Sequence, residues 1–354
     1  MSSERIDFSG QDLFIGIDTH LRQWKITVRT KNIALRTLSI NPDPKDLATF
    51  LHNHYPGATY RSVYEAGFCG FWIHRQLLKY NITNIVVNPA DVPTSHKEKD
   101  RKSDKVDSRK LARELSKDNL TPIYVPSESE QHMRSLCRVR FKVRQSITRV
   151  CNRIKAHLHI NGIPLPARSE TTHWSARFIT WLEGIEFSHQ AGRDCLDFYI
   201  EELREHRKRL LNITRLLRRY AAQEQVRELF KVLYQVPGIG FVTAMTFYTE
   251  LIDMSRFPSL DHVASFVGLV PSVSGSDEKN SDKGITERKN SYLRFLIIEA
   301  AWVAVRKDPV LSAKYEKLCL VMKKQEAIIR IARKLLSRIR FVWMNRQSYV
   351  VGVD

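Results

Sequence analysis

The chain has 354 residues and carries 57 Lys and Arg against 38 Asp and Glu, a formal net charge of +19. This length suffices for two or three domains with buried cores, and the charge favours a polyanionic partner because each neutralised phosphate releases condensed counterions. The sequence has no apolar run long enough to cross a bilayer, no signal-peptide pattern and no lipidation motif, so we expect a cytoplasmic protein with no membrane partner.

The cysteines are five in number and scattered: Cys69, Cys137, Cys151, Cys195 and Cys319. An odd count without a C-x-x-C pair argues against both a disulfide framework and a zinc site. We expect reduced structural thiols.

The first part of the chain alternates strand-like and helix-like segments. Short apolar or alternating runs predict strands at 12–17, 24–29, 33–40, 60–64 and 82–87, and helical spacing predicts helices at 44–54, at 71–78 and from 104 onward. This order of three strands, helix, strand, helix, strand and helix is that of a ribonuclease H-like fold.

Four acids fall on particular elements of this order. Asp18 closes the first strand, Glu65 ends the fourth, and Asp104 and Asp107 lie three residues apart on one face of the last helix. Two acids on one face repel unless a cation joins them, and hard oxygen ligands suit Mg²⁺ or Mn²⁺. Each acid alone could be a turn acid or a helix-start acid favoured by the helix dipole. In the ribonuclease H-like fold, acids on these elements converge on a metal pair, so we predict a metal site of all four.

The middle of the chain predicts long helices. Apolar residues step by three or four from Leu136 to Leu158, and leucines recur every seventh residue from Leu196 to Leu217, which indicates packing against another long helix, within the chain or across a dimer. Basic residues such as Arg138 and Arg140 on the outer faces could follow a nucleic-acid backbone or only be solvated.

The last part begins with two helices joined by the turn Pro237-Gly238-Ile239-Gly240. This is the pattern of a helix-hairpin-helix, in which Gly238 and Gly240 let backbone N–H groups approach a phosphate, although a simple glycine turn gives a similar pattern. A hydroxyl-rich loop follows at 269–277, and basic helices are predicted at 293–305, 310–323 and 326–343. The cations that we predict to contact nucleic acid are Lys102, Lys105 and Arg109 beside the acids and Arg294 in the last part.

These residues together resemble the DEDD transposases of insertion sequences, the family that includes the Piv-type DNA invertases. The motifs are Ile15-Gly16-Ile17-Asp18, Tyr64-Glu65-Ala66, Ser103-Asp104-Lys105-Val106-Asp107, Val236-Pro237-Gly238-Ile239-Gly240, Gly268-Leu269-Val270-Pro271-Ser272, Gly284-Ile285-Thr286 and Tyr292-Leu293-Arg294 followed by Ile298-Glu299-Ala300-Ala301-Trp302. The resemblance implies an α/β plus α protein. Its parts are a RuvC-like, ribonuclease H-like metal-binding domain at 1–126, a helical coiled-coil stalk at 127–226 and a helical transposase domain at 227–354.

The resemblance also implies a nucleophilic serine, which alignment of the loop places at Ser276, with Ser274 and Ser272 as alternatives. The chain departs from the family at two places. Asp277 stands where the family usually has Gly, and Ser108 stands where it often has a small apolar residue. The first departure touches the serine loop itself.

What the resemblance implies for function is cutting and rejoining of DNA through a phosphoserine, with Mg²⁺ or Mn²⁺ held by the four acids. It further implies a guide (bridge) RNA that pairs with donor and target DNA, a homo-oligomer, either dimer or tetramer, and a nucleoid-associated location. Two other interpretations stay open: a RuvC-like metal-dependent endonuclease that uses water, and a nucleic-acid-binding protein without catalysis.

Overall fold

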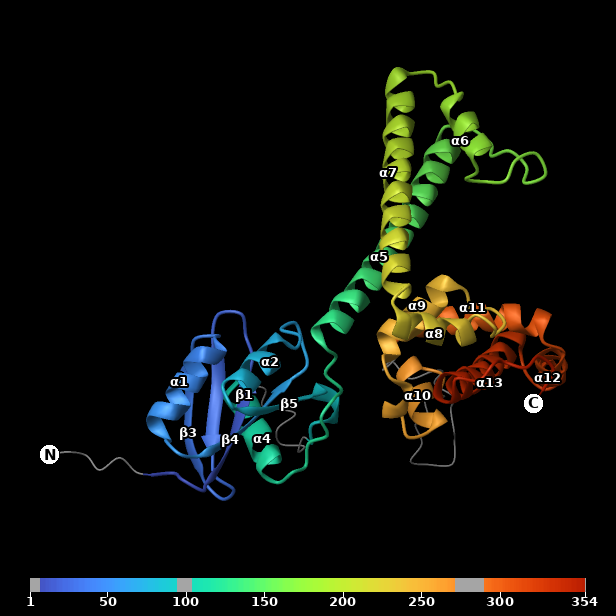
Figure 1. The fold of residues 1–354 in the computed structure, drawn as a ribbon. Helices are drawn as coiled ribbons and strands as arrows, with labels where there is room; N and C mark the ends of the chain where they lie inside the picture. The colour runs from blue at the N-terminus through green and yellow to red at the C-terminus, as the bar shows by residue number, and fades with distance from the viewer. Residues whose placement is uncertain (1–6, 94–103, 271–289, 354) are drawn as a thin grey trace. The chain divides into compact units, whose positions relative to one another are not determined.

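We analysed a computed structural model of the chain. It describes residues 7–93, 104–270 and 290–353, with the backbone alone for residues 104–106 and for Gln225 (Figure 1). The chain divides into two compact units, 1–126 and 127–354. The further division of the second unit into a stalk, 127–226, and a transposase domain, 227–354, stays a prediction.

The first unit is built on a five-stranded mixed sheet. Its strands are β1 (Asp12–Asp18), β2 (Trp24–Arg29), β3 (Ala34–Ile40), β4 (Thr59–Glu65) and β5 (Thr83–Val87). The order across the sheet is β3-β2-β1-β4-β5, with β2 antiparallel to β1 and β3, and with β4 parallel to β1 and β5. This arrangement fits the ribonuclease H-like fold that the element order predicts, and every strand lies within one residue of its predicted bounds.

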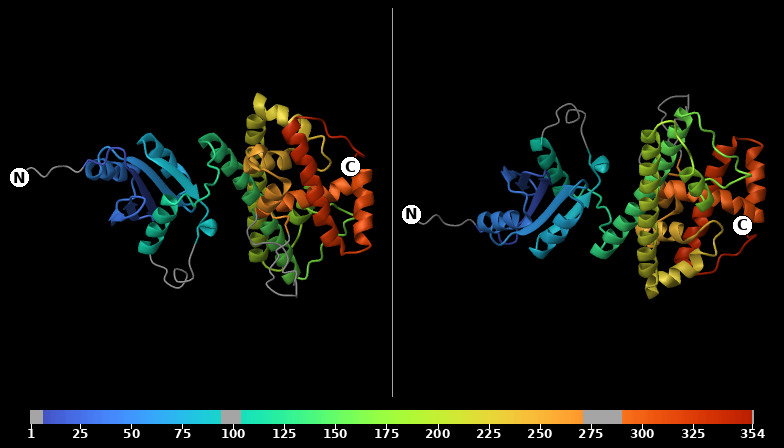
Figure 2. Two further views of the ribbon diagram at one scale, coloured as in Figure 1. Left: turned by 90° about the horizontal axis from the view of Figure 1, so that it is seen from below. Right: turned by 90° about the horizontal axis from the view of Figure 1, so that it is seen from above.

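Helices cover both faces of this sheet (Figure 2). Helices α1 (Pro44–His54) and α2 (Trp72–Lys79) bury Leu47, Leu51, Ile73 and Leu77 against one face. A short 3₁₀ turn, η1 (Pro89–Asp91), follows β5, and helix α4 (Asp104–Ser116) covers the opposite face.

Helix α4 lies unusually close to β1 because Gly16 has no side chain. A Cβ at Gly16 would lie 2.1 Å from the Ser108 carbonyl oxygen and 2.5 Å from the Ala112 backbone nitrogen. These distances are far inside van der Waals contact, so only glycine fits at this position of β1. The Ile15-Gly16-Ile17-Asp18 motif therefore has a packing requirement as well as an acid.

The second unit begins with two long helices that pack on each other. Helices α5 (Glu128–Ile160) and α7 (Gln190–Ala221) run side by side, and α6 (Ala176–Glu183) packs against their far end (Figure 1). A capping box of Ser127 and Glu130 starts α5. Of the leucines with seven-residue spacing, Leu196 and Leu203 are buried between α5, α6 and α7, so this interface lies within one chain.

Shorter helices form the rest of the second unit around one large core. They are α8 (Glu224–Leu233), α9 (Phe241–Leu251), η2 (Met254–Arg256), α10 (Leu260–Val267), α11 (Ser291–Lys307), α12 (Pro309–Cys319) and α13 (Lys324–Asn345). The core joins these helices to the first turns of α5 and the end of α7. Among the described residues, no helix combines the length and the apolar character needed to cross a membrane.

The Gly16 contact generates a stability prediction. We expect Gly16→Ala to lower the free energy of unfolding by about 1–3 kcal/mol, the usual cost of overpacking, because the new methyl group would meet the α4 backbone. Thermal or urea unfolding of the full chain measures it. Gly67→Ala is the matched control, since the nearest atom to its Cβ is 4.0 Å away. Equal stability of the two variants would contradict the packing role of Gly16.

Candidate functional site

Asp18 and Glu65 lie together at one edge of the sheet. They end the adjacent parallel strands β1 and β4, directly after the paired residues Ile17 and Tyr64. Neighbouring strands are ~4.8 Å apart. Gly16 and Val63 face α4, and Asp18 and Glu65 each come two residues later on the same strand. Because side chains two residues apart on a strand share a face, both acids lie on the face of the sheet that α4 covers. Asp18 also contacts His20, whose Nε2 lies 3.1 Å from Asp18 Oδ2.

The N-terminal turn of helix α4 is directed toward these two acids. Gly16 meets the helix at Ser108 and Ala112, while Phe14, further back on β1, shares a cluster with Leu111 and Leu115. The helix is therefore antiparallel to β1, and its first residues lie toward the Asp18 end of the strand. Asp107 is partly buried in this turn, and the helix begins at Asp104, whose side chain lies outside the described residues.

Ser108, one of the two departures from the family pattern, is fully buried with a partner. Its hydroxyl lies 2.9 Å from Thr27 Oγ1 on β2, and Thr27 in turn lies 3.1 Å from Thr37 Oγ1 on β3. A buried hydroxyl is tolerated when it is hydrogen-bonded. The polar side chain of Ser108 is therefore satisfied by its hydrogen bond with Thr27 on β2. This bond also helps to hold the first turns of α4, which carry Asp107, on the sheet.

The donor set suits a hard divalent cation, because carboxylates from two strand ends and one helix point to oxygen-only ligation. Three of the four acids have described side chains, and within the described residues no group of three or more His, Cys, Asp or Glu is arranged to hold an ion. A complete ligand set thus requires Asp104 or a rearrangement of the three others.

The cations predicted beside the acids are only partly described. Lys102 and the Lys105 side chain lie outside the described residues. Arg109 is exposed, and its Nε donates to Thr37 Oγ1 at 3.2 Å. Arg294, in the second unit, is half-buried in the first turn of α11, and burial lowers the pKa of its guanidinium.

The Pro237–Gly240 turn does connect two helices, α8 and α9, as expected. Gly238 has φ of +85°, and a Cβ there would lie 2.4 Å from the Ala300 carbonyl oxygen on α11, so packing explains this glycine. Gly240 is the N-cap of α9 and has open space around its Cα. Of the two glycines, Gly240 is the one that leaves room for a phosphate near a helix N-terminus. The assignment as a nucleic-acid-binding helix-hairpin-helix stays a prediction.

Ser276, with its alternatives Ser274 and Ser272, lies outside the described residues. The two ends of the segment that contains it are nevertheless held together. Gly268, with φ of +87°, ends α10, and the Asn290 backbone nitrogen donates to the Phe266 carbonyl oxygen at 3.1 Å. The Asn290 side chain then caps α11 by accepting from the Leu293 backbone nitrogen.

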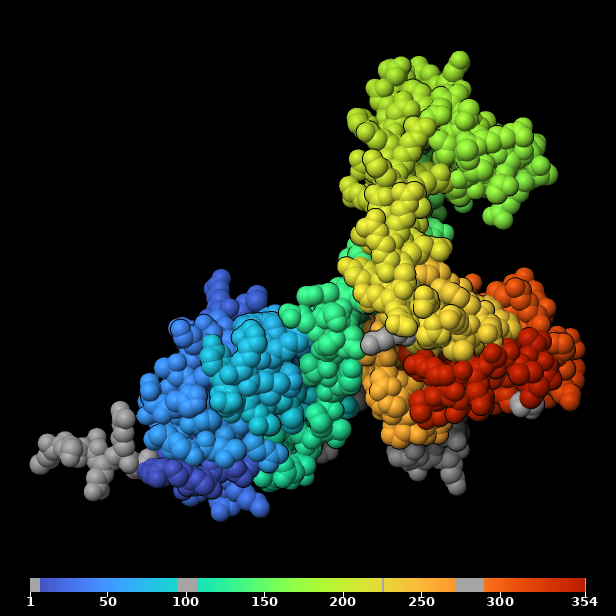
Figure 3. Space-filling model, in the orientation of Figure 1, coloured from blue at the N-terminus to red at the C-terminus, as the bar shows by residue number. Residues whose placement is uncertain are grey.

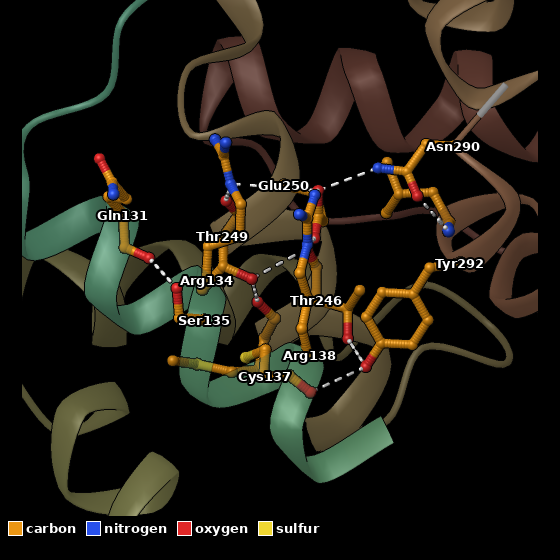
Figure 4. A network of polar contacts seen from close by, with 12 residues as sticks. Gln131, Arg134, Ser135, Cys137, Arg138, Thr246, Thr249, Glu250, Asn290 and Tyr292 are labelled. Carbon is orange, nitrogen blue, oxygen red and sulfur yellow. Dashed lines mark hydrogen bonds and ion pairs between the residues drawn. The ribbon is translucent and has the colours of Figure 1, made fainter. Parts of the chain in front are cut away.

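A buried carboxylate, Glu250 on α9, ties this point to α5 (Figure 4). Arg138 donates to both Glu250 oxygens at 2.8 and 2.9 Å, and Asn290 Nδ2 donates to Oε2 at 2.9 Å. Arg134 Nε donates to the Thr249 carbonyl oxygen at 2.8 Å. The hydrogen bond with Glu250 raises the pKa of the Arg138 guanidinium, so this guanidinium stays charged.

This network was not among the residues predicted from sequence. Arg138 is exposed, as expected, but it also pairs with Glu250, and Arg140 Nε donates to Thr214 Oγ1 at 2.9 Å. One signal was present: Glu250 is the lone charged residue of the helix Phe241–Leu251. A lone charge among apolar residues indicates a buried partner.

Comparison with known proteins decides the family. Residues 15–161 match the DEDD transposase model of IS110, and residues 230–316 match the model described as the transposase IS116/IS110/IS902 family. The chain belongs to this family of transposases. Its members are enzymes of DNA recombination, and the two models match this IS110-family chain over segments that contain the four acids and Ser276, respectively.

Individual proteins that are similar to this chain support its assignment to the IS110 family. The Sinorhizobium fredii protein y4qE is 28% identical over 68% of this chain, which spans 57% of that relative's length. The transposase for insertion sequence element IS1533 of Leptospira borgpetersenii is 23% identical over 82% of this chain and 84% of its own. The transposase for element IS1111A of Coxiella burnetii is 25% identical over 69% and 65%, respectively.

The hydrogen bonds and the ion pair of Glu250 should contribute strongly to the stability of the second unit. Glu250→Ala leaves Arg138 and Asn290 without their acceptor, so we expect the free energy of unfolding to fall by about 3 kcal/mol. This is the lower end of the range for a broken buried pair, because the Arg138 side chain keeps access to solvent. Glu205→Ala is the control, since its pair with Arg209 is exposed on both sides and should be worth less than about 1 kcal/mol. Similar unfolding midpoints for the two variants would refute the structural importance of Glu250.

Proposed function

We propose that this transposase cuts and rejoins DNA strands through a phosphoserine intermediate formed on Ser276. The first unit would supply Asp18, Glu65, Asp104 and Asp107 as ligands of Mg²⁺ or Mn²⁺, and the second unit would supply the serine. The observation that carries the proposal is the placement of Asp18 and Glu65 on adjacent strand ends with the N-terminal turn of α4 directed toward them.

The proposed step breaks one phosphodiester bond of the DNA and conserves its energy in a phosphoserine linkage. The Ser276 hydroxyl loses its proton and attacks the scissile phosphorus, the bond to one deoxyribose oxygen breaks, and that oxygen leaves as a DNA hydroxyl end. A DNA hydroxyl then attacks the phosphoserine and releases the serine, which rejoins strands without a nucleotide cofactor. A serine hydroxyl is a weak nucleophile by itself, so its activation is the main requirement of the mechanism.

Divalent ions held by the four acids would supply activation of the hydroxyl and neutralisation of the phosphate and the leaving oxygen. The chain's own residues set where this happens. Gly16 and the Ser108–Thr27 hydrogen bond hold the start of α4 on the sheet, and Asn290 with Glu250 holds one end of the segment that carries Ser276. These contacts place the start of α4 and Asn290 on regular elements, and a site built on such elements is more precise than one on loops.

We also propose the partners that the family resemblance implies. These are donor and target DNA, a guide RNA that reads sequence by base pairing, and a second copy or more of this chain. The excess of 19 positive charges supports a polyanionic partner. The proposed location is the cytoplasm, at the nucleoid.

The carboxylate set is tested by Asp107→Asn and Asp104→Asn. Each variant keeps the side-chain shape but removes a charged ligand, so we expect loss of strand cleavage by at least about 100-fold with nucleic-acid binding unchanged. Cleavage of element-end DNA in Mg²⁺, and gel-shift affinity, are the measurements. Asp118→Asn is the control, because Asp118 lies beyond the end of α4 in an exposed pair with Arg61. Wild-type cleavage by both Asp104 and Asp107 variants would remove the metal site from the proposal.

The nucleophile is tested by Ser276→Ala. We expect this variant to lose the covalent protein–DNA adduct on a denaturing gel, because no other group then attacks the phosphorus, while Ser274→Ala keeps it. An adduct that persists in Ser276→Ala and disappears in Ser274→Ala would shift the nucleophile to Ser274. Cleavage without any adduct in the wild type, giving free 5′-phosphate ends, would instead support a water-using endonuclease.

A further inference from the structure

A small pocket lies where α7, α8 and α9 meet in the second unit, and Phe241, the residue after Gly240, is part of its lining. Its volume is about 230 Å³. Besides two alanines, the lining residues are three cations and three aromatic residues: Arg218, Arg227, Lys231, Phe230, Tyr234 and Phe241. The helices α7 and α8 that carry most of them reach the surface of the unit (yellow in Figure 3).

The aromatic side of the pocket is held by the core. Phe230 is 3% exposed and makes an edge-to-face contact with Tyr234, with ring centroids 5.6 Å apart. Phe230 also contacts Phe241, whose other neighbour is the Arg218 guanidinium, 4.7 Å from the ring centroid. Tyr234 itself is 46% exposed. A pre-positioned exposed ring and an arginine plane are the surfaces on which unpaired bases stack.

The cationic side of the pocket carries an excess of positive charge. Arg227 and Lys231 share one carboxylate, Glu228, at 3.6 and 2.7 Å. Arg218 packs on a ring and brings a third positive charge. Three cations against one acid leave a net attraction for an anion beside the rings.

The size and chemistry together define the ligand class. The volume is below the ~300–1,000 Å³ that encloses drug-sized ligands, so the pocket admits one planar ring system and not a base pair. A nucleotide offers both an aromatic ring and an adjacent negative charge, which match the two kinds of side chain in this pocket. We propose that this pocket binds one unpaired nucleotide of a single-stranded nucleic acid, with its base on Tyr234 and its phosphate at Arg218, Arg227 and Lys231.

This inference rests on the proposed function only in taking the partner to be nucleic acid, since it needs neither the metal site nor Ser276. The two therefore fail separately. Loss of the adduct or of cleavage tests the first, whereas the experiments below measure binding in the absence of divalent metal.

The first experiment maps the contact in the wild-type full chain. Single-stranded eight-nucleotide probes that contain 5-iodouracil, one RNA and one DNA, are irradiated with the protein, and cross-linked peptides are identified by mass spectrometry. We expect a cross-link within residues 230–241 from at least one probe, and the stronger probe identifies the source strand as RNA or DNA. A duplex of the same sequence should not give it. Failure of both single strands, or equal cross-linking by the duplex, overturns the proposal.

The second experiment uses matched substitutions. Tyr234→Ala should weaken binding of the cross-linking strand by about 5- to 150-fold, the effect of losing one stacked base. Tyr220→Ala is the control, because Tyr220 is equally exposed at 43% but does not line the pocket. Equal effects of the two tyrosine substitutions contradict a stacking site.

The charge contribution is tested in the same way. Arg218→Ala should reduce the slope of log affinity against log salt by about 0.7, the value for one lost phosphate contact on a single strand. Arg219→Ala, the neighbouring exposed residue outside the pocket, should leave this slope closer to that of the wild type. A larger change in the Arg219 variant would overturn the assignment of the phosphate to Arg218.

Discussion

The close approach of helix α4 to strand β1 at Gly16 is the contact on which the first unit's candidate site depends. Because the Ser108 and Ala112 backbones occupy the space of a side chain at Gly16, the helix has one height and one register on the sheet. That register directs the turn with Asp107 toward the Asp18 end of β1, while the parallel pairing of β1 and β4 places Glu65 beside Asp18. The position of three acids thus follows from one glycine and one strand pair, which are elements of the core and not of a loop.

Local pattern predicted most of the first unit, and the reason is physical. Strand alternation and helical spacing depend on neighbours within a few residues, so the five strands and α1 appeared in the sequence at nearly their final bounds. The pattern was weaker for α6, which was not predicted: its Phe178, Ile179 and Leu182 form one short apolar face that packs against the far end of the α5–α7 pair. The leucine repeat of α7 predicted a helical partner but could not identify it, because periodicity describes one face and not what covers it.

The polar interactions of the second unit show where such reasoning ends. Glu250 receives Arg138 from 112 residues earlier and Asn290 from 40 residues later. No local spacing encodes a pairing over these distances; only the position of Glu250 as the lone charged residue of α9 indicated that a partner exists. The acid positions of the candidate metal site could be predicted because they end or begin regular elements. The serine could be placed only by resemblance, and it lies outside the described residues.

Several glycines and arginines of this chain make contacts within the fold, so fewer of them are available to bind nucleic acid. Gly238 is required by its contact with Ala300, as Gly16 is by α4, so neither is explained by a phosphate. Many arginines of the long helices likewise have acids: Arg138 with Glu250, Arg153 with Glu202, Arg193 with Asp197, Arg204 with Glu183 and Arg209 with Glu205. The net charge of +19 therefore does not mean that all parts of the surface bind a polyanion equally well. It counts most where cations outnumber acids, as beside Glu228, where three cations and the exposed Tyr234 ring meet and where a flexible single strand can place both a phosphate and a base.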